Sequence, residues 1–149
     1  MKLNVKMKIE EITAEQTYGL RKKELRKNMS LSSKFRGDLD ADTFHLGLFI
    51  NNEIVSIVSF MRSDYKEFTE KQFQLRGMAT KENYQGKGFG KMLITKSEEL
   101  LKEKEVIIVW CNARIVALDF YKKQGFKIIG KEFDIPQIGG HFVMYKKLI

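Results

Sequence analysis

The hydrophobic and polar positions of the chain change period several times, and each change predicts a different element. Val5, Met7 and Ile9 alternate with charged residues, as the positions of a half-buried strand do. Residues 44–50 and 54–61 are two β-rich runs joined through Asn51-Asn52-Glu53. Asn residues between two such runs are typical of a tight turn, so the pattern predicts a hairpin.

A helix is predicted between the first strand and this hairpin. Thr13 is followed three positions later by Gln16, the spacing of a capping box at a helix start. Tyr18, Leu25 and Met29 fall near one helical face, and the polar stretch 30–42 then predicts a loop.

The second half of the chain alternates between helical and strand patterns. Apolar positions at helical spacing predict a helix over about 88–104, and the continuous apolar run 106–110 fits a central strand parallel to the strand before that helix. A short helix ends at Gly125, a suitable left-handed terminator, and 126–133 and 141–148 are strand-like. This order predicts a mixed α/β sheet with a βαβ unit at its middle and antiparallel strands at the edges.

Length and composition favour a single domain. The 149 residues are 43% hydrophobic, enough for one ordinary core and too few for two. No stretch is long and apolar enough to cross a bilayer, and the start lacks the apolar run of a signal peptide. We therefore expect a soluble, cytoplasmic protein with no membrane partner.

Charge and cysteine content narrow the chemistry. The net charge of +8 favours anionic partners, but mixed-sign runs such as Lys102-Glu103-Lys104-Glu105 are typical of a solvated helix end, so nucleic acid is only a second candidate. Cys111 is the single cysteine and lies in an apolar run, which indicates a buried thiol. Two histidines and one cysteine without ligand spacing do not predict a metal site.

The most informative segment joins a strand over 73–80 to a glycine-rich turn over 85–91 that opens the predicted helix. Such a turn presents free backbone N–H groups to phosphate oxygens. It is not a Walker loop, because the spacing from Gly86 to Gly90 is too short and Met92 follows Lys91. It also lacks the third glycine of the dinucleotide fingerprint, since Lys91 stands there.

The spacing of this turn resembles the pyrophosphate arm of the GNAT superfamily of acyl-CoA-dependent N-acyltransferases. The turn that matches is Gln85-Gly86-Lys87-Gly88-Phe89-Gly90. Three further segments are similar to the family's cofactor-facing strand, to the end of its next strand and to its Tyr-x-x-x-Gly-Phe helix. In that order they are Leu75-Arg76-Gly77-Met78-Ala79, Trp110-Cys111-Asn112-Ala113 and 117–126.

The resemblance implies one GNAT N-acetyltransferase domain over 1–149 with acetyl-CoA as co-substrate and no metal. The fold it implies is a single-domain α/β (α+β) fold, with a mixed, mostly antiparallel sheet, a central splayed parallel strand pair and helices on both faces. The activity it implies is transfer of an acetyl group to a primary amine, on a small molecule or a peptide, by direct attack in a ternary complex. By family analogy, a homodimer is also an expectation.

The resemblance also assigns roles to individual positions. Gly77 is the place for a β-bulge that splays the strand pair. The backbone of Met78, Ala79 and Thr80 would pair with the pantetheine arm, and the Met78 N–H would stabilise the oxyanion. Residues of the glycine turn would hold the pyrophosphate, and three more would line the other wall of the gap. The turn residues are Gln85, Gly86, Lys87, Gly88, Phe89, Gly90 and Lys91, and the wall residues are Asn112, Phe120 and Tyr121.

Proton transfer needs an acid and a base. Tyr121 matches the position of a general acid that protonates the leaving thiolate, and an aromatic core residue is the alternative. The candidates for the general base are His141, His45, Glu82 or a water relay from another carboxylate.

The acceptor is not fixed by the sequence. An acidic cluster could meet a cationic amine, or could be a solvated loop. It consists of Asp38, Asp40 and Asp42. Two other functions stay open: a CoA-binding sensor without turnover, and a basic nucleic-acid-binding domain.

Overall fold

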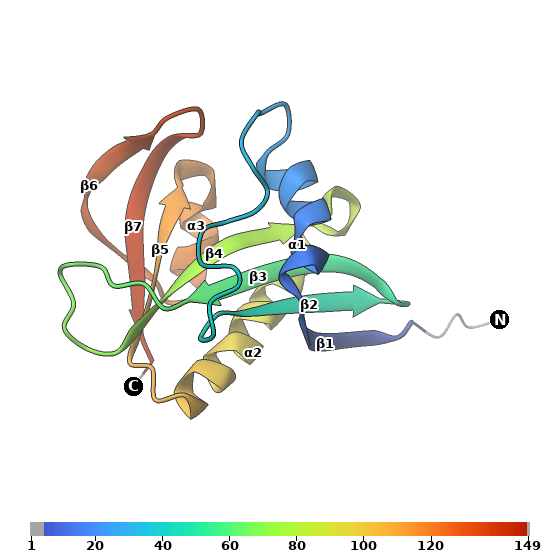
Figure 1. Cartoon of the computed structure of the whole chain (residues 1–149), viewed down its shortest axis with the longest axis horizontal. Helices are drawn as coiled ribbons and strands as arrows, with labels where there is room; N and C mark the ends of the chain where they lie inside the picture. The colour runs from blue at the N-terminus through green and yellow to red at the C-terminus, as the bar shows by residue number, and fades with distance from the viewer. Residues whose placement is uncertain (1–4, 149) are drawn as a thin grey trace.

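A computed structural model describes residues 5–148 and contains one seven-stranded sheet in the order β1-β2-β3-β4-β5-β7-β6 (Figure 1). All neighbouring strands are antiparallel except β4 and β5, which are parallel. The predicted mixed sheet with one parallel pair at its middle is confirmed.

The first strand and the first helix are present, but the half-buried pattern predicted for the strand is wrong, because Val5 lies before it and Val5 and Met7 are 64% and 44% exposed. β1 spans Met7–Ile12 and α1 spans Ala14–Leu20, and Thr13 and Gln16 exchange both hydrogen bonds of a capping box. A π-helical segment, η1, continues over Arg21–Leu25. The prediction that Met29 extends this helix is wrong, because the chain leaves helical geometry at Arg26 and Asn28 is left-handed with a φ of 59°.

The predicted hairpin is confirmed. β2 spans Phe44–Ile50 and β3 spans Glu53–Met61, so the turn consists of Asn51 and Asn52. Both residues have positive φ, 49° and 69°, which is the geometry that suits the right-handed twist of the two strands.

The βαβ unit follows. β4 spans Gln72–Thr80, a 3₁₀ turn η2 spans Glu82–Tyr84, α2 spans Phe89–Glu103 and β5 spans Ile108–Arg114. The strand predicted over 106–110 therefore begins later and runs further. Val106 instead caps the end of α2 by donating its backbone N–H to Leu101, after a left-handed Glu105.

The remaining elements are η3 (Ile115–Ala117), α3 (Leu118–Lys123), β6 (Lys127–Ile135) and β7 (Gly139–Lys147). Gly125 has a φ of 93° and ends α3 as predicted. The strand predicted over 126–133 runs further, to Ile135, because Asp134 and Ile135 still pair with β7. The turn between β6 and β7 contains Gln137, with a φ of 71°.

The helices cover both faces of the sheet (Figure 1). On one face, Leu93, Ile94 and Leu101 of α2 join the main hydrophobic core. On the other face, Leu20 of α1 packs in a separate cluster with Ile12 and Ile57. Among residues 5–148, no helix is long and apolar enough to cross a membrane.

Candidate active site

The site begins where β4 and β5 separate. The two strands pair only from Gln72 to Gln74, and beyond that point their ribbons diverge (Figure 1). On its other side β4 carries a β-bulge, because Ser59 pairs with Arg76 and Ile57 with Ala79, which leaves Val58 opposite two residues. One of those two is Gly77, with a φ of 61°, so the predicted bulge at Gly77 is confirmed.

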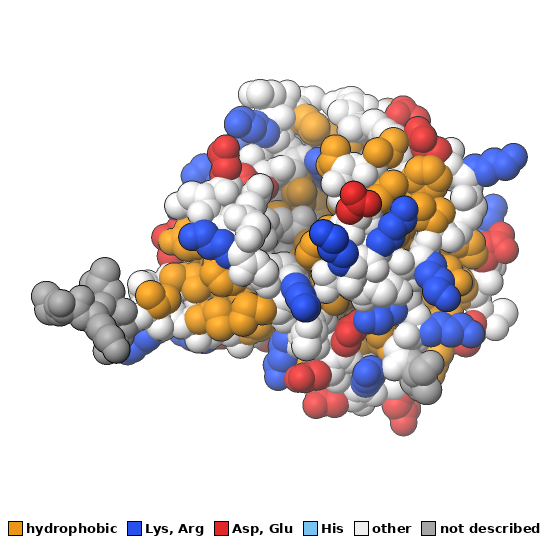
Figure 2. Space-filling model, turned by 180° about the vertical axis from the view of Figure 1, so that it is seen from behind, with side chains coloured by type: hydrophobic (Ala, Val, Ile, Leu, Met, Phe, Trp, Pro, Cys, Tyr) orange, Lys and Arg blue, Asp and Glu red, His pale blue; other side chains and the backbone are white. Residues whose placement is uncertain are grey.

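A cavity of about 310 Å³ lies between the separated strands. Its walls come from the end of η1 and the segment after it, from β4, from β5 and η3, from α3, and from β6, β7 and the turn between them. The back of the molecule is hollowed, with hydrophobic side chains visible inside the hollow and Lys and Arg side chains around it (Figure 2). The lining residues are Glu24, Leu25, Arg26, Phe35, Gln74, Leu75, Arg76, Gly77, Met78, Cys111, Asn112, Ala113, Arg114, Val116, Ala117, Tyr121, Ile135, Ile138 and His141.

Of the residues to which the sequence analysis gave catalytic or cofactor-binding roles, four meet at this cavity: Met78, Asn112, Tyr121 and His141. Met78 stands in the bulge and has no partner in β3, whereas Asn112 lies on β5. The four therefore come from β4, β5, α3 and β7, which are far apart in sequence.

Tyr121 is buried in the aromatic core and also lines the cavity. Its ring contacts Phe120 edge-on, with centroids 5.2 Å apart, and lies 5.4 Å from the Phe126 ring. Burial raises the pKa of Tyr121 well above its usual value, Cys111 adds to the increase, and Arg114 opposes it. The phenol therefore stays protonated at neutral pH. The two interpretations of Tyr121, core residue and proton donor, are compatible with one position.

The structure separates the candidate bases by position. His141 is buried in the cavity wall, and its Nδ1 lies 2.6 Å from the Gly139 carbonyl oxygen. A carbonyl only accepts, so Nδ1 carries the hydrogen and Nε2 of the neutral ring has a free lone pair. His45 lies outside the cavity wall, with its two ring nitrogens 2.6 Å from Ser59 Oγ and 3.1 Å from the Asp38 carbonyl. Glu82 is exposed on η2.

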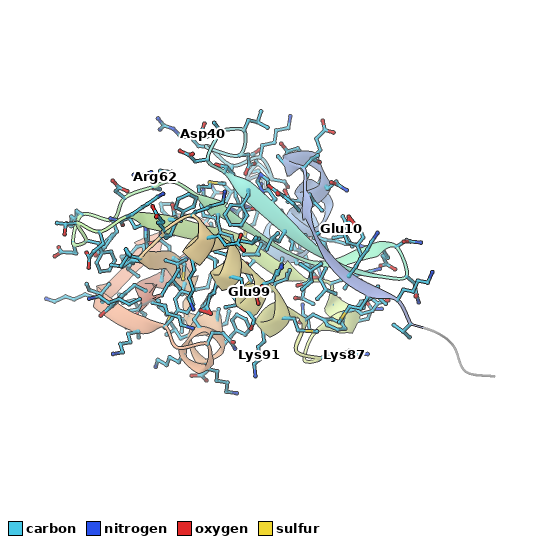
Figure 3. All side chains as sticks on the ribbon, turned by 90° about the horizontal axis from the view of Figure 1, so that it is seen from below. Glu10, Asp40, Arg62, Lys87, Lys91 and Glu99 are labelled. Carbon is cyan, nitrogen blue, oxygen red and sulfur yellow. The ribbon has the colours of Figure 1, made fainter. Side chains whose placement is uncertain are left out.

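The glycine turn lies next to the cavity at the start of α2. Gly86 and Gly88 have φ values of 76° and 84°, and no heavy atom lies within 4 Å of a Cβ built on either. The backbone there is open to a close approach. Among the described residues, no side chain caps α2, so the N–H groups of its first turn point outward. Lys87 and Lys91 lie by this helix start (Figure 3).

The turn is fixed to the strand and to α3 by specific contacts. The Gln85 side chain donates a hydrogen bond to the Thr80 carbonyl at 2.8 Å. A Cβ at Gly90 would come within 3.2 Å of the Phe120 ring and 3.5 Å of the Met78 methyl, so glycine is what lets these three residues meet. The Ala79 side chain is buried in the cluster of Ile12, Leu20 and Ile57 on the α1 face of the sheet.

The acidic cluster of the sequence is divided by the fold. Asp38 is buried and forms a bidentate ion pair with Arg21, with N···O distances of 2.7 and 3.0 Å. Asp38 is therefore neither solvated nor free to meet an amine, so both interpretations of the acidic cluster are wrong for this residue. Asp40 and Asp42 are exposed, and Asp40 is labelled in Figure 3.

Sequence reasoning missed the charged residues of the cavity wall. Arg26, Arg76 and Arg114 line it together with Glu24. No local pattern marks them, because their neighbours in the fold are distant in sequence. Arg114, for example, donates a hydrogen bond at 2.8 Å to the Leu25 carbonyl, which is 89 residues away. Only the folding of the sheet brings these side chains together.

Known proteins are similar to this chain in sequence and in fold. The profile of the acetyltransferase (GNAT) family matches residues 7–126. The uncharacterized N-acetyltransferase YitI of Bacillus subtilis (strain 168) is 41% identical over 144 residues, which covers 95% of this chain and 97% of YitI.

Solved structures agree at the level of the fold. Escherichia coli ElaA superposes with a TM-score of 0.79 at 18% identity, covering 95% of this chain and 99% of ElaA. An aminoglycoside 6'-N-acetyltransferase complexed with coenzyme A superposes with a TM-score of 0.76 at 14% identity, covering 95% and 97% of the two chains. On the family match and the YitI identity, this chain belongs to the acetyltransferase (GNAT) family and is an enzyme of its N-acetyltransferase type.

Proposed function

We propose that the protein transfers an acetyl group from acetyl-CoA to a small primary amine, by direct attack while both substrates are bound. One observation carries the proposal: β4 and β5 separate after three residue pairs around a cavity that Met78, Tyr121 and His141 line together. Unpaired backbone groups along two splayed strands are suited to hold an amide-containing arm such as pantetheine.

Residues 85–91 are proposed to bind the diphosphate of the co-substrate. The open backbone at Gly86 and Gly88 lets phosphate oxygens approach the N–H groups at the start of α2, where the helix dipole favours negative charge. Lys87 and Lys91 add positive charge at the same end of the helix. Acetyl-CoA supplies the activated acetyl group, and these residues hold it in place.

Met78 is proposed to stabilise the negative charge that develops on the thioester oxygen. Its backbone lies in the bulge, where no residue of β3 faces it as a pairing partner. A backbone N–H fixed by a rigid strand is a preorganised donor, because it needs no reorganisation during the reaction.

Tyr121 and His141 are proposed to move the two protons. As the C–N bond forms and the C–S bond breaks, the phenol of Tyr121 gives its proton to the departing thiolate. Burial raises the pKa of Tyr121, so the phenol keeps its proton until the thiolate leaves. His141 takes the amine proton on Nε2, the ring nitrogen that the Gly139 contact leaves free.

The proposal is tested by titrating acetyl-CoA and CoA into the protein in a calorimeter and by measuring thiol release with a panel of primary amines. Gly88→Trp should abolish binding of both, because its side chain blocks backbone approach. Gly19→Trp is the control, since Gly19 is an exposed helical position with open space around it. If the folded protein gives no heat of binding with either compound, the proposal is wrong. Tight binding without thiol release on any amine would favour the alternative of a CoA sensor.

A further inference from the structure

Three guanidinium groups meet on the wall of the candidate active-site cavity. Arg26 follows η1, Arg76 lies on β4 and Arg114 ends β5. Glu24 is the only acidic side chain among the lining residues. Within residues 5–148, no carboxylate lies within 4.0 Å of any of these three guanidiniums, although Arg21 behind them is neutralised by Asp38.

The ring of Phe35 lies close to several guanidinium groups. The guanidinium carbons of Arg76, Arg26 and Arg21 lie 4.4, 5.1 and 3.8 Å from its centroid. Burial lowers the pKa of Arg76, the charge of Arg21 lowers it further, and the charge of Asp38 opposes both effects. Burial, and then the charges of Arg114, Arg76 and Arg21, lower the pKa of Arg26. Because arginine stays protonated at neutral pH, this cavity holds mutually repelling cations that a bound anion would stabilise.

The same side chains have donors to spare. The Nε–H of Arg26 is buried, and among the described residues it has no partner. Within residues 5–148, the Arg76 side chain makes no hydrogen bond. Arg114 uses one of its donors on the Leu25 carbonyl. Buried donors in folded proteins are nearly always paired, and guanidiniums match the geometry of carboxylate and phosphate oxygens.

The remaining charged residue of the wall has the opposite sign. Oε2 of Glu24 is buried and has no hydrogen-bond partner within residues 5–148. A carboxylate accepts hydrogen bonds from an amine, so Glu24 and the guanidiniums suit the two ends of a molecule that carries both charges.

From this juxtaposition we infer that the acceptor is a small amine that also carries an anionic oxygen group, a carboxylate or a phosphate. Arg26, Arg76 and Arg114 bind the anionic group, and Glu24 accepts hydrogen bonds from the amine. The cavity of about 310 Å³ must also admit the acetyl end of the co-substrate, so the acceptor is about the size of an amino acid. The inference rests on the proposed acetyltransferase function and names its substrate class.

Matched amines test it. β-Alanine is compared with β-alaninamide, and phosphoethanolamine with ethanolamine, by thiol release and by mass spectrometry of the N-acetyl product. At least one anionic member should have a kcat/KM about 100-fold above its uncharged partner, because the partner leaves the guanidiniums unpaired. The pair that shows the difference tells carboxylate from phosphate. Equal rates, or faster acetylation of both uncharged partners, overturn the inference.

The variants are Arg76→Gln, Arg76→Lys and, as a control, Arg62→Gln. Arg62 is exposed, is not part of the cavity wall and lies at the opposite edge from Lys87 and Lys91 (Figure 3). Arg76→Gln should raise KM for the anionic amine about tenfold or more while sparing the uncharged one. Arg76→Lys should recover part of the loss, and Arg62→Gln should change neither. An equal loss on both amines would mean a structural role and would overturn the assignment.

A binding measurement covers the case in which no amine of the panel turns over. With CoA present at saturation, N-acetyl-β-alanine and N-acetyl-phosphoethanolamine are added separately and the melting temperature is measured. At least one should raise it in the wild type and in Arg62→Gln, but not in Arg76→Gln. No shift with either compound overturns the inference. Loss of acetyl-CoA binding itself, in contrast, would remove the proposed function.

Discussion

Arg21 and Asp38 form a buried ion pair that ties the segment after α1 to the loop before β2. Asp38 also accepts a hydrogen bond from the Phe35 N–H at 2.8 Å, and Arg21 donates to the Ser33 carbonyl and to Ser59 Oγ. The pair therefore holds the loop that places Phe35 in the cavity wall. Its contribution is positional as much as energetic.

Asp38→Asn should destabilise the protein by about 3 kcal/mol, because it leaves the Arg21 charge buried without a counterion. Chemical denaturation measures this loss. Asp40→Asn, in the same loop but exposed, should change stability by less than about 0.5 kcal/mol. A comparable loss in both variants would argue that the loop, and not the ion pair, is responsible.

The ion pair also predicts a pH dependence. Burial raises the pKa of Asp38. Hydrogen bonds from Arg21 and Phe35 and the charges of Arg21 and His45 lower this pKa by more, so the net pKa of Asp38 lies below its usual value. A carboxyl whose folded pKa is lowered contributes stability that is present above about pH 4 and is lost as pH falls through the lowered pKa. The difference in stability between wild type and Asp38→Asn should therefore shrink below about pH 4.

Tyr121→Phe should lower kcat about 100-fold and leave the Kd of acetyl-CoA nearly unchanged, because only the proton donor is lost. Tyr145→Phe is the control, since Tyr145 is partly exposed on β7 and does not line the cavity. Because the pKa of Tyr121 is raised, ionisation of this residue should cause no fall in kcat below about pH 10. Wild-type turnover in Tyr121→Phe would remove the general-acid role.

Gly77→Ala should disturb the bulge. Gly77 has a φ of 61°, and an added Cβ would stand 3.0 Å from the Phe35 ring and 3.1 Å from Arg21 Nε. We expect a loss of about 1–3 kcal/mol by denaturation and a higher KM for both substrates. Gly19→Ala in α1 has open space and should stabilise the protein by about 0.5–1 kcal/mol. An unaltered KM in Gly77→Ala would show that the bulge is not needed for binding.

Cys111 should resist thiol reagents in the folded protein. It is 1% exposed, and burial raises its pKa, so very little thiolate is present to react. Labelling with a disulfide reagent at pH 8 should be at least about 1000-fold slower than in the protein unfolded with guanidinium. Rapid labelling of the native protein would contradict the buried position.

The parts of this protein that the sequence predicted are those set by neighbouring residues. The Thr13 and Gln16 capping box, the Asn51-Asn52 turn and the Gly125 helix end all formed as expected. Each depends on interactions within a few residues, which the chain order alone determines. The glycine turn and the family resemblance of the second half follow from the same local spacing.

What the sequence could not decide depends on pairing between distant segments. The burial of Asp38, the exclusion of His45 from the cavity and the meeting of Arg26, Arg76 and Arg114 follow from which strands pair and where they separate. A charged residue has the same local pattern whether it faces solvent or a cavity, and only the tertiary structure sets the dielectric and the partners around it. The sequence thus determined the elements and the family, and the fold decided which charges face the substrate.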